Sequence, residues 1–216
     1  MTLPEKQSIV KNDITDRHGL TGGWLNMAKL VFHYGAMGSS KTANALMVAY
    51  NYEERGQHAL ILKPATDTRD GVHTVYSRIG LSNTCRLIDE FLEEYVKNPD
   101  AVRKYDAIIV DEAQFATPEQ IDLFSDIVDT YQIPVLCYGL RADFQNKFFP
   151  GSRRLMEIAD EIKEIKTICW CGKKATCNAR YDDNGIIKEG AQVVLGANDK
   201  YIALCRKHFK EGNLGR

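Results

Sequence analysis

A short turn rich in glycine and serine, directly before a lysine, constrains this chain more than any other feature. Residues 35–42 read GAMGSSKT and match the phosphate-binding pattern G-x-x-x-x-G-K-[ST] except at Ser40, where the pattern has glycine. The apolar run KLVFHY precedes the turn, and a helix-like stretch follows it from Thr42 to about Arg55. The sequence therefore predicts a strand, a phosphate-binding loop and a helix, in that order.

The predicted loop offers several groups to a phosphate. Its backbone N–H groups and the N-terminus of the following helix attract negative charge. Lys41 brings a positive charge to the β- and γ-phosphates, and the Thr42 hydroxyl can bind Mg²⁺. The alternative interpretation is an ordinary strand, turn and helix with a solvated lysine. The loop residues expected to bind nucleotide are Gly35, Ala36, Met37, Gly38, Ser39, Ser40, Lys41 and Thr42.

Ser40 is the one departure from the phosphate-binding pattern. A serine keeps the backbone N–H, so the loop survives the change if the φ angle of Ser40 is negative. A left-handed conformation would instead cost a residue with a side chain about 1–2 kcal/mol. The conformation of Ser40 therefore decides whether the departure is neutral.

A second motif, DAIIVDEAQF, ends an apolar strand in two acids, Asp111 and Glu112. Asp111 is placed to bind Mg²⁺ directly or through water. Glu112 is placed to accept a proton from an attacking hydroxyl or water. Two solvated acids at the start of a loop are the alternative, which the lysine loop in the same chain makes weaker. Because strand ends converge in a doubly wound sheet, we expect Asp111 to face Lys41 and Thr42.

The order of elements predicts an α/β fold: a P-loop parallel sheet with helices on both faces. Strands are expected at HALILK, YDAIIV and PVLCYGL, and helices near residues 86–97, after Pro118 and near residues 152–160. Residues 1–26 are polar and form an expected N-terminal extension, and residues 27–163 form the core. Residues 164–216 are expected to form a small lid, too short to hold its own core without a staple.

Composition excludes several kinds of partner. The chain has 216 residues, 44% of them hydrophobic and 26% charged, with a net charge of −1. No global basic field would attract polymeric nucleic acid. No segment approaches the roughly 20 apolar residues of a membrane span, and the first 26 residues contain no signal-peptide core. We therefore expect a cytoplasmic protein without a membrane partner.

The cysteines suggest a metal site near the C-terminus. Cys169 and Cys171 form a C-x-C pair, and Cys205 and His208 form a C-x-x-H pair. Two such pairs can bind Zn²⁺ tetrahedrally, and four protein ligands leave no open position, so the zinc would be structural. Alternatively these cysteines are small buried residues beside a surface histidine, or Cys177 replaces one ligand. We expect the remaining cysteines, Cys85 and Cys137, in the core.

Six blocks in order resemble one family from about Met27 to Lys210: GAMGSSKT, KPATDTR, VDEAQF, YGLRADFQNKFFPGS, KTICWCGKKAT and VVLGANDKYIALCRKH. They resemble the thymidine kinases of the zinc-containing class, found in bacteria, animals and poxviruses. The resemblance implies transfer of the γ-phosphoryl group of ATP, with Mg²⁺, to the 5′-hydroxyl of thymidine or deoxyuridine. It also implies a homotetramer and feedback inhibition by dTTP.

The resemblance also implies residue roles. Lys41, Arg69 and Glu112 are expected to be catalytic, with Glu112 as the general base and Arg69 near the transferred phosphate. Thr42 and Asp111 are expected to hold Mg²⁺. The segment 192–201 resembles the loop that grips the base through backbone groups. Expected substrate-binding residues are Met37, Asp67, Arg69, Phe115, Leu140, Phe144, Phe149, Val194, Gly196 and Tyr201.

Two other functions compete with this expectation. Ser40 replaces the last glycine of the family's loop, so the chain is alternatively a nucleotide-binding regulator or inactive homologue. A P-loop ATPase with another substrate is a third possibility, against which the base-gripping segment argues. Release of ADP that depends on thymidine would separate the three.

Overall fold

The computed structural model describes residues 27–67, 71–192 and 200–215. In these residues a six-stranded sheet has the order β5-β2-β6-β7-β1-β8, and every neighbouring pair is parallel. The predicted parallel sheet is therefore confirmed, and all six strands end at the same edge. The strands are β1 (Leu30–Tyr34), β2 (Ala59–Lys63), β5 (Arg86–Leu87), β6 (Ala107–Val110), β7 (Val135–Gly139) and β8 (Glu161–Glu164).

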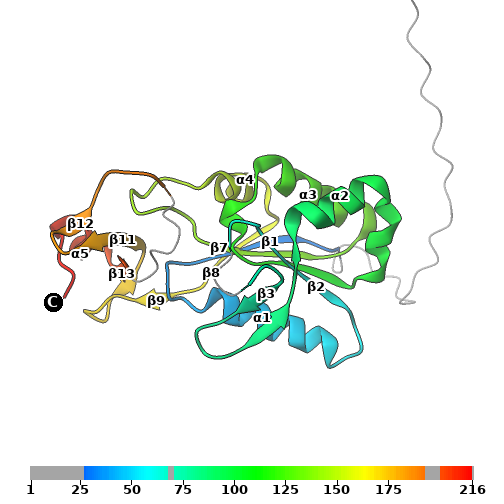
Figure 1. Ribbon diagram of the computed structural model, residues 1–216, viewed down its shortest axis with the longest axis horizontal. Coiled ribbons are helices and arrows are strands. Elements are labelled where there is room, and N and C mark those ends of the chain that lie inside the picture. The colour runs from blue at the N-terminus through cyan, green and yellow to red at the C-terminus, as the bar shows by residue number, and fades with distance from the viewer. Residues whose placement is uncertain (1–26, 68–70, 193–199, 216) are drawn as a thin grey trace, which may run out of the picture.

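Helices cover both faces of the sheet, as predicted (Figure 1). One face packs against α1 (Lys41–Glu53), and the other packs against α2 (Ile88–Lys97), α3 (Pro118–Tyr131) and α4 (Pro150–Ile158). Two short 3-10 helices, η1 (Pro99–Lys104) and η2 (Ala113–Phe115), flank β6 in the chain. The helix α3 begins with a capping box in which Thr117 and Gln120 satisfy each other's backbone N–H groups.

The apolar strands explain why the helices divide between the two faces. All four residues of β6 are buried, and successive side chains point to opposite faces. Ile108 and Val110 join the core cluster with α2, α3 and α4, whereas Ile109 joins the cluster with α1. A strand buried on both sides must be continuously apolar, which is the pattern DAIIV shows.

Four strands of the larger unit were not predicted. The edge strand β8 is polar, and Glu161 in it pairs with Lys29 at 2.5 Å and Lys163 at 2.5 Å, so it lacks the apolar pattern of an inner strand. The hairpin of β3 (Thr74–Tyr76) and β4 (Ser82–Thr84) is short and mostly exposed. The pairing of β5 with β2 delays the start of α2 to Ile88.

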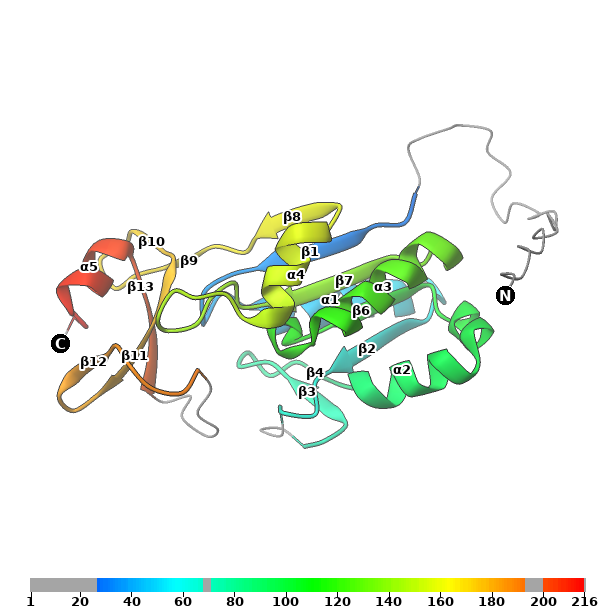
Figure 2. The ribbon, with the colours of Figure 1, turned by 90° about the horizontal axis from the view of Figure 1, so that it is seen from above.

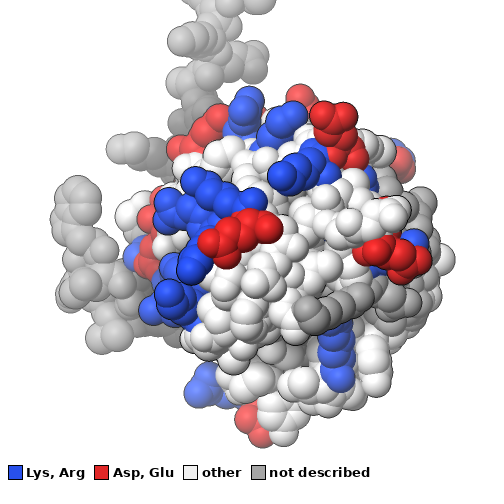
Figure 3. Space-filling view, turned by 90° about the vertical axis from the view of Figure 1, so that its left-hand side faces the viewer, with Lys and Arg blue, Asp and Glu red and all other residues white. Residues whose placement is uncertain are grey.

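Beyond the carboxyl edge of the sheet, a smaller set of elements forms one end of the molecule (Figure 2). A hairpin of two strands adjoins a three-stranded antiparallel sheet and a short helix. Seen from this end, Lys and Arg side chains gather along one margin with acids among them (Figure 3). The elements are β9 (Thr167–Ile168), β10 (Lys174–Ala175), β11 (Cys177–Asp182), β12 (Gly185–Ile187), β13 (Tyr201–Leu204) and α5 (Arg206–Glu211).

The predicted N-terminal extension, residues 1–26, lies outside the described residues. None of the helices in the described part of the chain has the length and apolarity needed to cross a membrane.

Candidate active site and metal centre

The loop between β1 and α1 is tightly built around Gly35. A side chain at Gly35 would place its Cβ 2.4 Å from the Ile165 carbonyl oxygen and from Ser39 Oγ, so only glycine fits. Lys41 folds over the loop, and its Nζ donates to the Gly35 carbonyl at 3.3 Å, the Ala36 carbonyl at 3.0 Å and Ser39 Oγ at 3.3 Å. The lysine charge is therefore held above the backbone that would surround a phosphate.

Ser40 adopts the left-handed conformation, with φ 60° and ψ 30°. Its side chain is exposed and makes no capping hydrogen bond to the helix it precedes. Its carbonyl accepts hydrogen bonds from Asn44 N and Asn44 Nδ2, both at 3.0 Å. The negative φ that would make the serine neutral is thus not found, and the loop holds a non-glycine residue in a conformation that favours glycine.

The substitution Ser40→Gly should therefore tighten MgATP binding or leave it unchanged, and should not lower the melting temperature. Glycine removes a left-handed strain of about 1–2 kcal/mol, partly offset by the greater entropy of the unfolded chain. Isothermal titration calorimetry with MgATP would measure the effect. Ser40→Ala is the matched control, because it removes the hydroxyl and keeps the strain. Weaker binding in both variants would mean that the hydroxyl itself binds nucleotide.

Asp111 follows β6 and lies beside the phosphate loop. It is buried, its N–H donates to the Leu62 carbonyl at 2.9 Å, and its carboxylate accepts a hydrogen bond from the Thr42 side chain. Burial and then the charge of Glu112 raise the pKa of Asp111 to about 7, while Thr42 and the charge of Lys41 act in the opposite direction. The structure therefore brings Asp111 to Thr42 and Lys41, as the two motifs together predicted.

These groups fit a divalent cation. Mg²⁺ prefers hard oxygen ligands and binds through one or two protein groups together with substrate phosphates. The buried Asp111 carboxylate and the Thr42 hydroxyl supply such oxygens. The pKa of Asp111 is raised because burial and the Glu112 charge disfavour its ionised form more than its neighbours stabilise it. A bound cation would stabilise that ionised form.

Glu112 lies next to this pair at the end of β6. It is half-buried, has a φ of 51°, and caps η2. Its backbone N–H donates to the Asp111 carboxylate, and its own carboxylate accepts a hydrogen bond from Gln114 Nε2. Gln114 was not predicted as a site residue. Its amide oxygen accepts a hydrogen bond from the Leu140 N–H, and Leu140 is distant from it in the chain.

A cavity of about 360 Å³ adjoins these residues. Phe115 and Phe149 both line it, and their rings contact each other edge-on, with centroids 5.6 Å apart. An aromatic cavity of this size suits a planar base. Its lining residues are Gln114, Phe115, Ala116, Thr117, Pro118, Phe149, Pro150 and Gln192.

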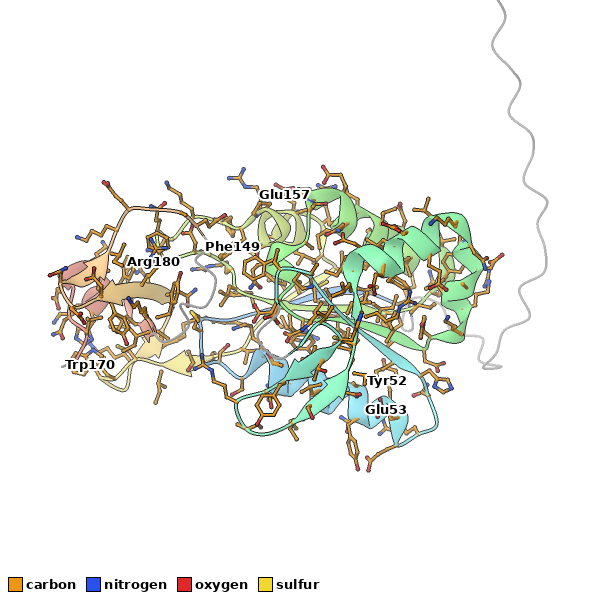
Figure 4. The ribbon with its side chains drawn as sticks, viewed as in Figure 1. Tyr52, Glu53, Phe149, Glu157, Trp170 and Arg180 are labelled. Atoms are coloured by element: carbon orange, nitrogen blue, oxygen red, sulfur yellow. The ribbon has the colours of Figure 1, made fainter. Side chains whose placement is uncertain are left out.

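Arg180 fastens the segment that leads toward residue 192. It is buried in β11, its NH1 donates to the Ala191 carbonyl at 2.9 Å, and its NH2 donates to the Glu189 carbonyl at 3.3 Å. Its guanidinium lies 3.8 Å from the centre of the Phe144 ring, a cation–π contact. Figure 4 shows Arg180 in the smaller unit and Phe149 at the start of α4. Phe144 therefore packs under Arg180 instead of lining the cavity.

Two further side chains bind the same segment to residues 142–148. Gln192 Nε2 donates to Asp143 Oδ2 at 2.8 Å, and Gln145 Nε2 donates to the Lys188 carbonyl at 3.1 Å. Asp143 is buried and its other oxygen accepts from the backbone N–H groups of Gln145 and Lys147. Residues 188–192 are thus anchored on the core at the margin of the cavity.

The smaller unit also touches the phosphate loop. Asn178 is buried in β11, where its Oδ1 accepts from the Met37 N–H at 2.8 Å and its Nδ2 donates to the Ala142 carbonyl at 2.8 Å. Thr167 Oγ1 donates to the Gly38 carbonyl at 3.3 Å. The backbone of the phosphate loop is consequently held by side chains from both units.

Three thiols and an imidazole converge at the far end of the smaller unit. The ligand atoms of Cys169, Cys171, Cys205 and His208 all lie within 4.8 Å of one another. Cys169 Sγ is 3.4 Å from His208 Nδ1, and Cys171 Sγ is 4.0 Å from Cys205 Sγ. These separations and this donor set fit tetrahedral Zn²⁺, whose bonds are about 2.0–2.3 Å long. The cluster can hold a structural zinc, as the two spaced pairs predicted.

The cluster favours the thiolate of Cys169, whereas its contacts with Cys169 and Cys205 raise the pKa of Cys171. Desolvation raises the pKa of Cys169, but hydrogen bonds from the backbone of Cys171 and Cys205 and from His208 outweigh it and bring this pKa to about 6. Thiolates are the form that binds zinc. The Trp170 ring stacks on His208 at 4.2 Å between centroids and fixes the imidazole.

The chain matches the thymidine kinase family over residues 28–209. The chain belongs to the thymidine kinase family. Curated thymidine kinases are similar in sequence to this chain over nearly their whole length. A thymidine kinase of Legionella pneumophila (strain Lens) is 46% identical over 88% of this chain and 93% of its own. Those of Enterobacteria phage T4 (47%, 86% of this chain, 97% of its own) and Haemophilus influenzae KW20 (46%, 86% and 97%) are similar.

Only some of the residues predicted to bind the substrate lie at the cavity. The structure brings Phe115 and Phe149 to the cavity. Leu140 and Tyr201 are half-buried and are not among its lining residues; Met37 lies at the loop, where its N–H is bound by Asn178. Asp67 is half-buried after β2 and donates its N–H to the Pro64 carbonyl at 3.1 Å. Arg69, Val194 and Gly196 lie outside the described residues.

The remaining cysteines are divided as follows. Cys85 and Cys137 are buried in the core, as predicted. Cys177 is buried in β11 and is not part of the four-residue cluster, so the structure favours Cys169, Cys171, Cys205 and His208 over the alternative in which Cys177 replaces a ligand.

Proposed function

We propose that this protein transfers the γ-phosphoryl group of ATP to the 5′-hydroxyl of thymidine or deoxyuridine, forming the 5′-monophosphate and ADP. The observation that carries the proposal is the convergence of Lys41, Thr42, Asp111 and Glu112 at one edge of the sheet, in a chain of the thymidine kinase family. Lys41 and the backbone N–H groups of residues 35–40 hold the phosphates. Mg²⁺ bound with ATP would be held by Thr42 and Asp111 and would neutralise charge on the phosphate oxygens.

In the transfer, the nucleoside 5′-oxygen forms a bond to the γ-phosphorus as the bond from that phosphorus to the β–γ bridging oxygen breaks. Glu112 takes the proton of the 5′-hydroxyl, and ADP leaves with the bridging oxygen. Lys41 and Arg69 stabilise the charge that spreads over the transferred phosphoryl oxygens. Asp67 is assigned to the same substrate site.

The base binds in the cavity that Phe115 and Phe149 line, where contact with aromatic and apolar side chains suits a pyrimidine ring. We assign Met37, Leu140, Phe144 and Tyr201 to the surroundings of this site. The loop after Gln192 would grip the base through backbone groups near Val194 and Gly196. Anchoring of residues 188–192 by Arg180 and Asp143 supports this assignment, because it holds that loop's beginning beside the cavity.

The smaller unit serves as a lid with one structural zinc bound by Cys169, Cys171, Cys205 and His208. We propose the division into an extension over residues 1–26, a core over residues 27–163 and the lid over residues 164–216. Family membership further supports a cytoplasmic homotetramer inhibited by dTTP, and dTTP would occupy the thymidine and phosphate sites together.

ADP release by the purified protein tests the proposal. With MgATP, thymidine or deoxyuridine should raise ADP release at least about 100-fold, because the general base acts only on a bound 5′-hydroxyl. Deoxycytidine and deoxyguanosine are the controls and should not raise it. Release without dependence on a nucleoside would indicate a P-loop ATPase of another kind. Thymidine binding without release would indicate an inactive homologue whose loop is disabled by Ser40.

A further inference from the structure

Gln114 connects the end of β6 to the end of β7. It lies in η2 with a fully buried side chain. Its Nε2 donates to Glu112 Oε2, and its Oε1 accepts from the Leu140 N–H at 2.9 Å. One amide therefore bridges the acid proposed as the general base and a backbone group of a neighbouring strand end.

The hydrogen-bond partners fix which way the amide faces. The Leu140 N–H is a donor, so it requires the amide oxygen and not the NH₂ group. The NH₂ group must then face Glu112, whose carboxylate accepts. Rotating the amide by half a turn would set two donors against each other at Leu140 and two oxygens against each other at Glu112. Gln114 can hold Glu112 in only one arrangement.

Gln114 is closely packed against the end of β7. A Cβ at Gly139 would lie 2.7 Å from Gln114 Oε1 and 3.0 Å from Gln114 N, so a glycine is required at the end of β7. Leu140 is itself held, because Ser152 Oγ in α4 donates to its carbonyl at 2.5 Å. Ser152 is fully buried. The bridge from Glu112 thus ends on packed backbone and not on a loop free to shift.

We propose that Gln114 is a positioning residue for Glu112: its buried amide holds the carboxylate in the direction from which it takes the 5′-hydroxyl proton. The inference rests on the proposed function, because it assigns Gln114 a role only through Glu112. A carboxylate at the end of a flexible side chain needs such a partner, since a displacement of about 1 Å in a reacting group can cost roughly 100-fold in rate. Gln114 does not touch the transferred group.

Two substitutions test the role. Gln114→Glu keeps the acceptor for Leu140 and replaces the donor to Glu112 with an oxygen, and Gln114→Met removes both. Each should lower kcat roughly 10- to 100-fold and leave the KM for ATP within about three-fold. Gln120→Met is the matched control: it deletes another glutamine with two side-chain hydrogen bonds, in the capping box of α3. It should lower the melting temperature and leave kcat unchanged.

A double-mutant cycle separates positioning from general damage. In a Glu112→Gln background, Gln114→Met should cause no further loss of kcat, because no base remains to be positioned. The same loss in both backgrounds, or a KM for ATP that rises as kcat falls, would overturn the inference. So would a full kcat in Gln114→Glu. If Glu112→Gln alone leaves kcat unchanged, the proposed base fails instead, and the two failures are distinguishable.

Discussion

Replacing Glu112 by Gln should lower kcat at least about 100-fold while the dissociation constant for MgATP stays within about two-fold. Glutamine has the same size and can occupy the same position, but its amide cannot accept the proton of the 5′-hydroxyl. The hydrogen bond from Gln114 can be made to the amide oxygen, so the local structure is preserved. Steady-state kinetics and calorimetry with MgATP would measure the two quantities.

The retention of ATP binding follows from the electrostatics of the site. The charge of Glu112 helps raise the pKa of Asp111 to about 7. Removing that charge lowers the pKa of Asp111 and favours its ionised form, which is the form that binds a cation. The phosphate loop and Lys41 are unchanged. Binding of MgATP should therefore not weaken, and if anything should strengthen near neutral pH.

Glu119→Gln is the matched control for this prediction. Glu119 is an exposed acid in the first turn of α3, a few residues from Glu112 in the chain. Its substitution should leave kcat within about two-fold, because the side chain is exposed and lies outside the site. Surface substitutions of this kind also seldom change the free energy of unfolding by more than about 0.5 kcal/mol. An unchanged kcat in Glu112→Gln would remove Glu112 from the role of general base, whatever the control shows.

The sequence predicted the parts of the site that depend on local pattern and on sheet direction. The loop that contains Lys41 and Thr42 follows one strand, and Asp111 follows another. Parallel strands end at one edge of the sheet, so these residues had to meet, although β7 lies between their strands. The zinc cluster was predicted for a similar reason, because each of its ligand pairs is local.

The parts that the sequence did not predict depend on contacts between distant segments. The amide of Gln114 finds Leu140, 26 residues away, and Asn178 finds Met37, 141 residues away. The spacing of residues in the sequence does not predict hydrogen bonds between such distant residues. The left-handed φ of Ser40 was not predicted either, because the packing of the loop imposes it against the preference of a serine. The polar strand β8 was missed since apolar periodicity signals burial, and an edge strand need not be buried.

The cluster of Cys169, Cys171, Cys205 and His208 lies in a unit that has little core of its own. The buried apolar residues of this unit are few, and two of them, Cys169 and Cys205, belong to the cluster itself. Structural zinc supplies folding free energy to such units directly, about 10–16 kcal/mol in isolated zinc-finger peptides. The stability of this unit also matters to the phosphate loop, because Asn178 and Thr167 hold the backbone of Met37 and Gly38. Loss of a zinc bound here should therefore lower the stability of the protein and also weaken its binding of ATP.

The protein should contain one zinc per chain, and Cys171→Ser should weaken zinc binding at least about 100-fold and lower the melting temperature by about 4–8 °C. The serine hydroxyl is a poor zinc ligand, and the temperature shift corresponds to about 2 kcal/mol in a chain of this size. The KM for ATP should rise as well, because the lid no longer holds the phosphate loop. Elemental analysis, thermal unfolding and steady-state kinetics would measure these effects.

Cys177→Ser is the matched control, because Cys177 is a buried thiol in β11 that lies outside the cluster. It should keep one zinc per chain and the wild-type KM, even if burial of the hydroxyl lowers the melting temperature slightly. A rise in KM on Cys171→Ser but not on Cys177→Ser would connect the metal to the phosphate loop through Asn178 and Thr167. A protein without zinc that is equally stable and active would contradict the structural role of the cluster.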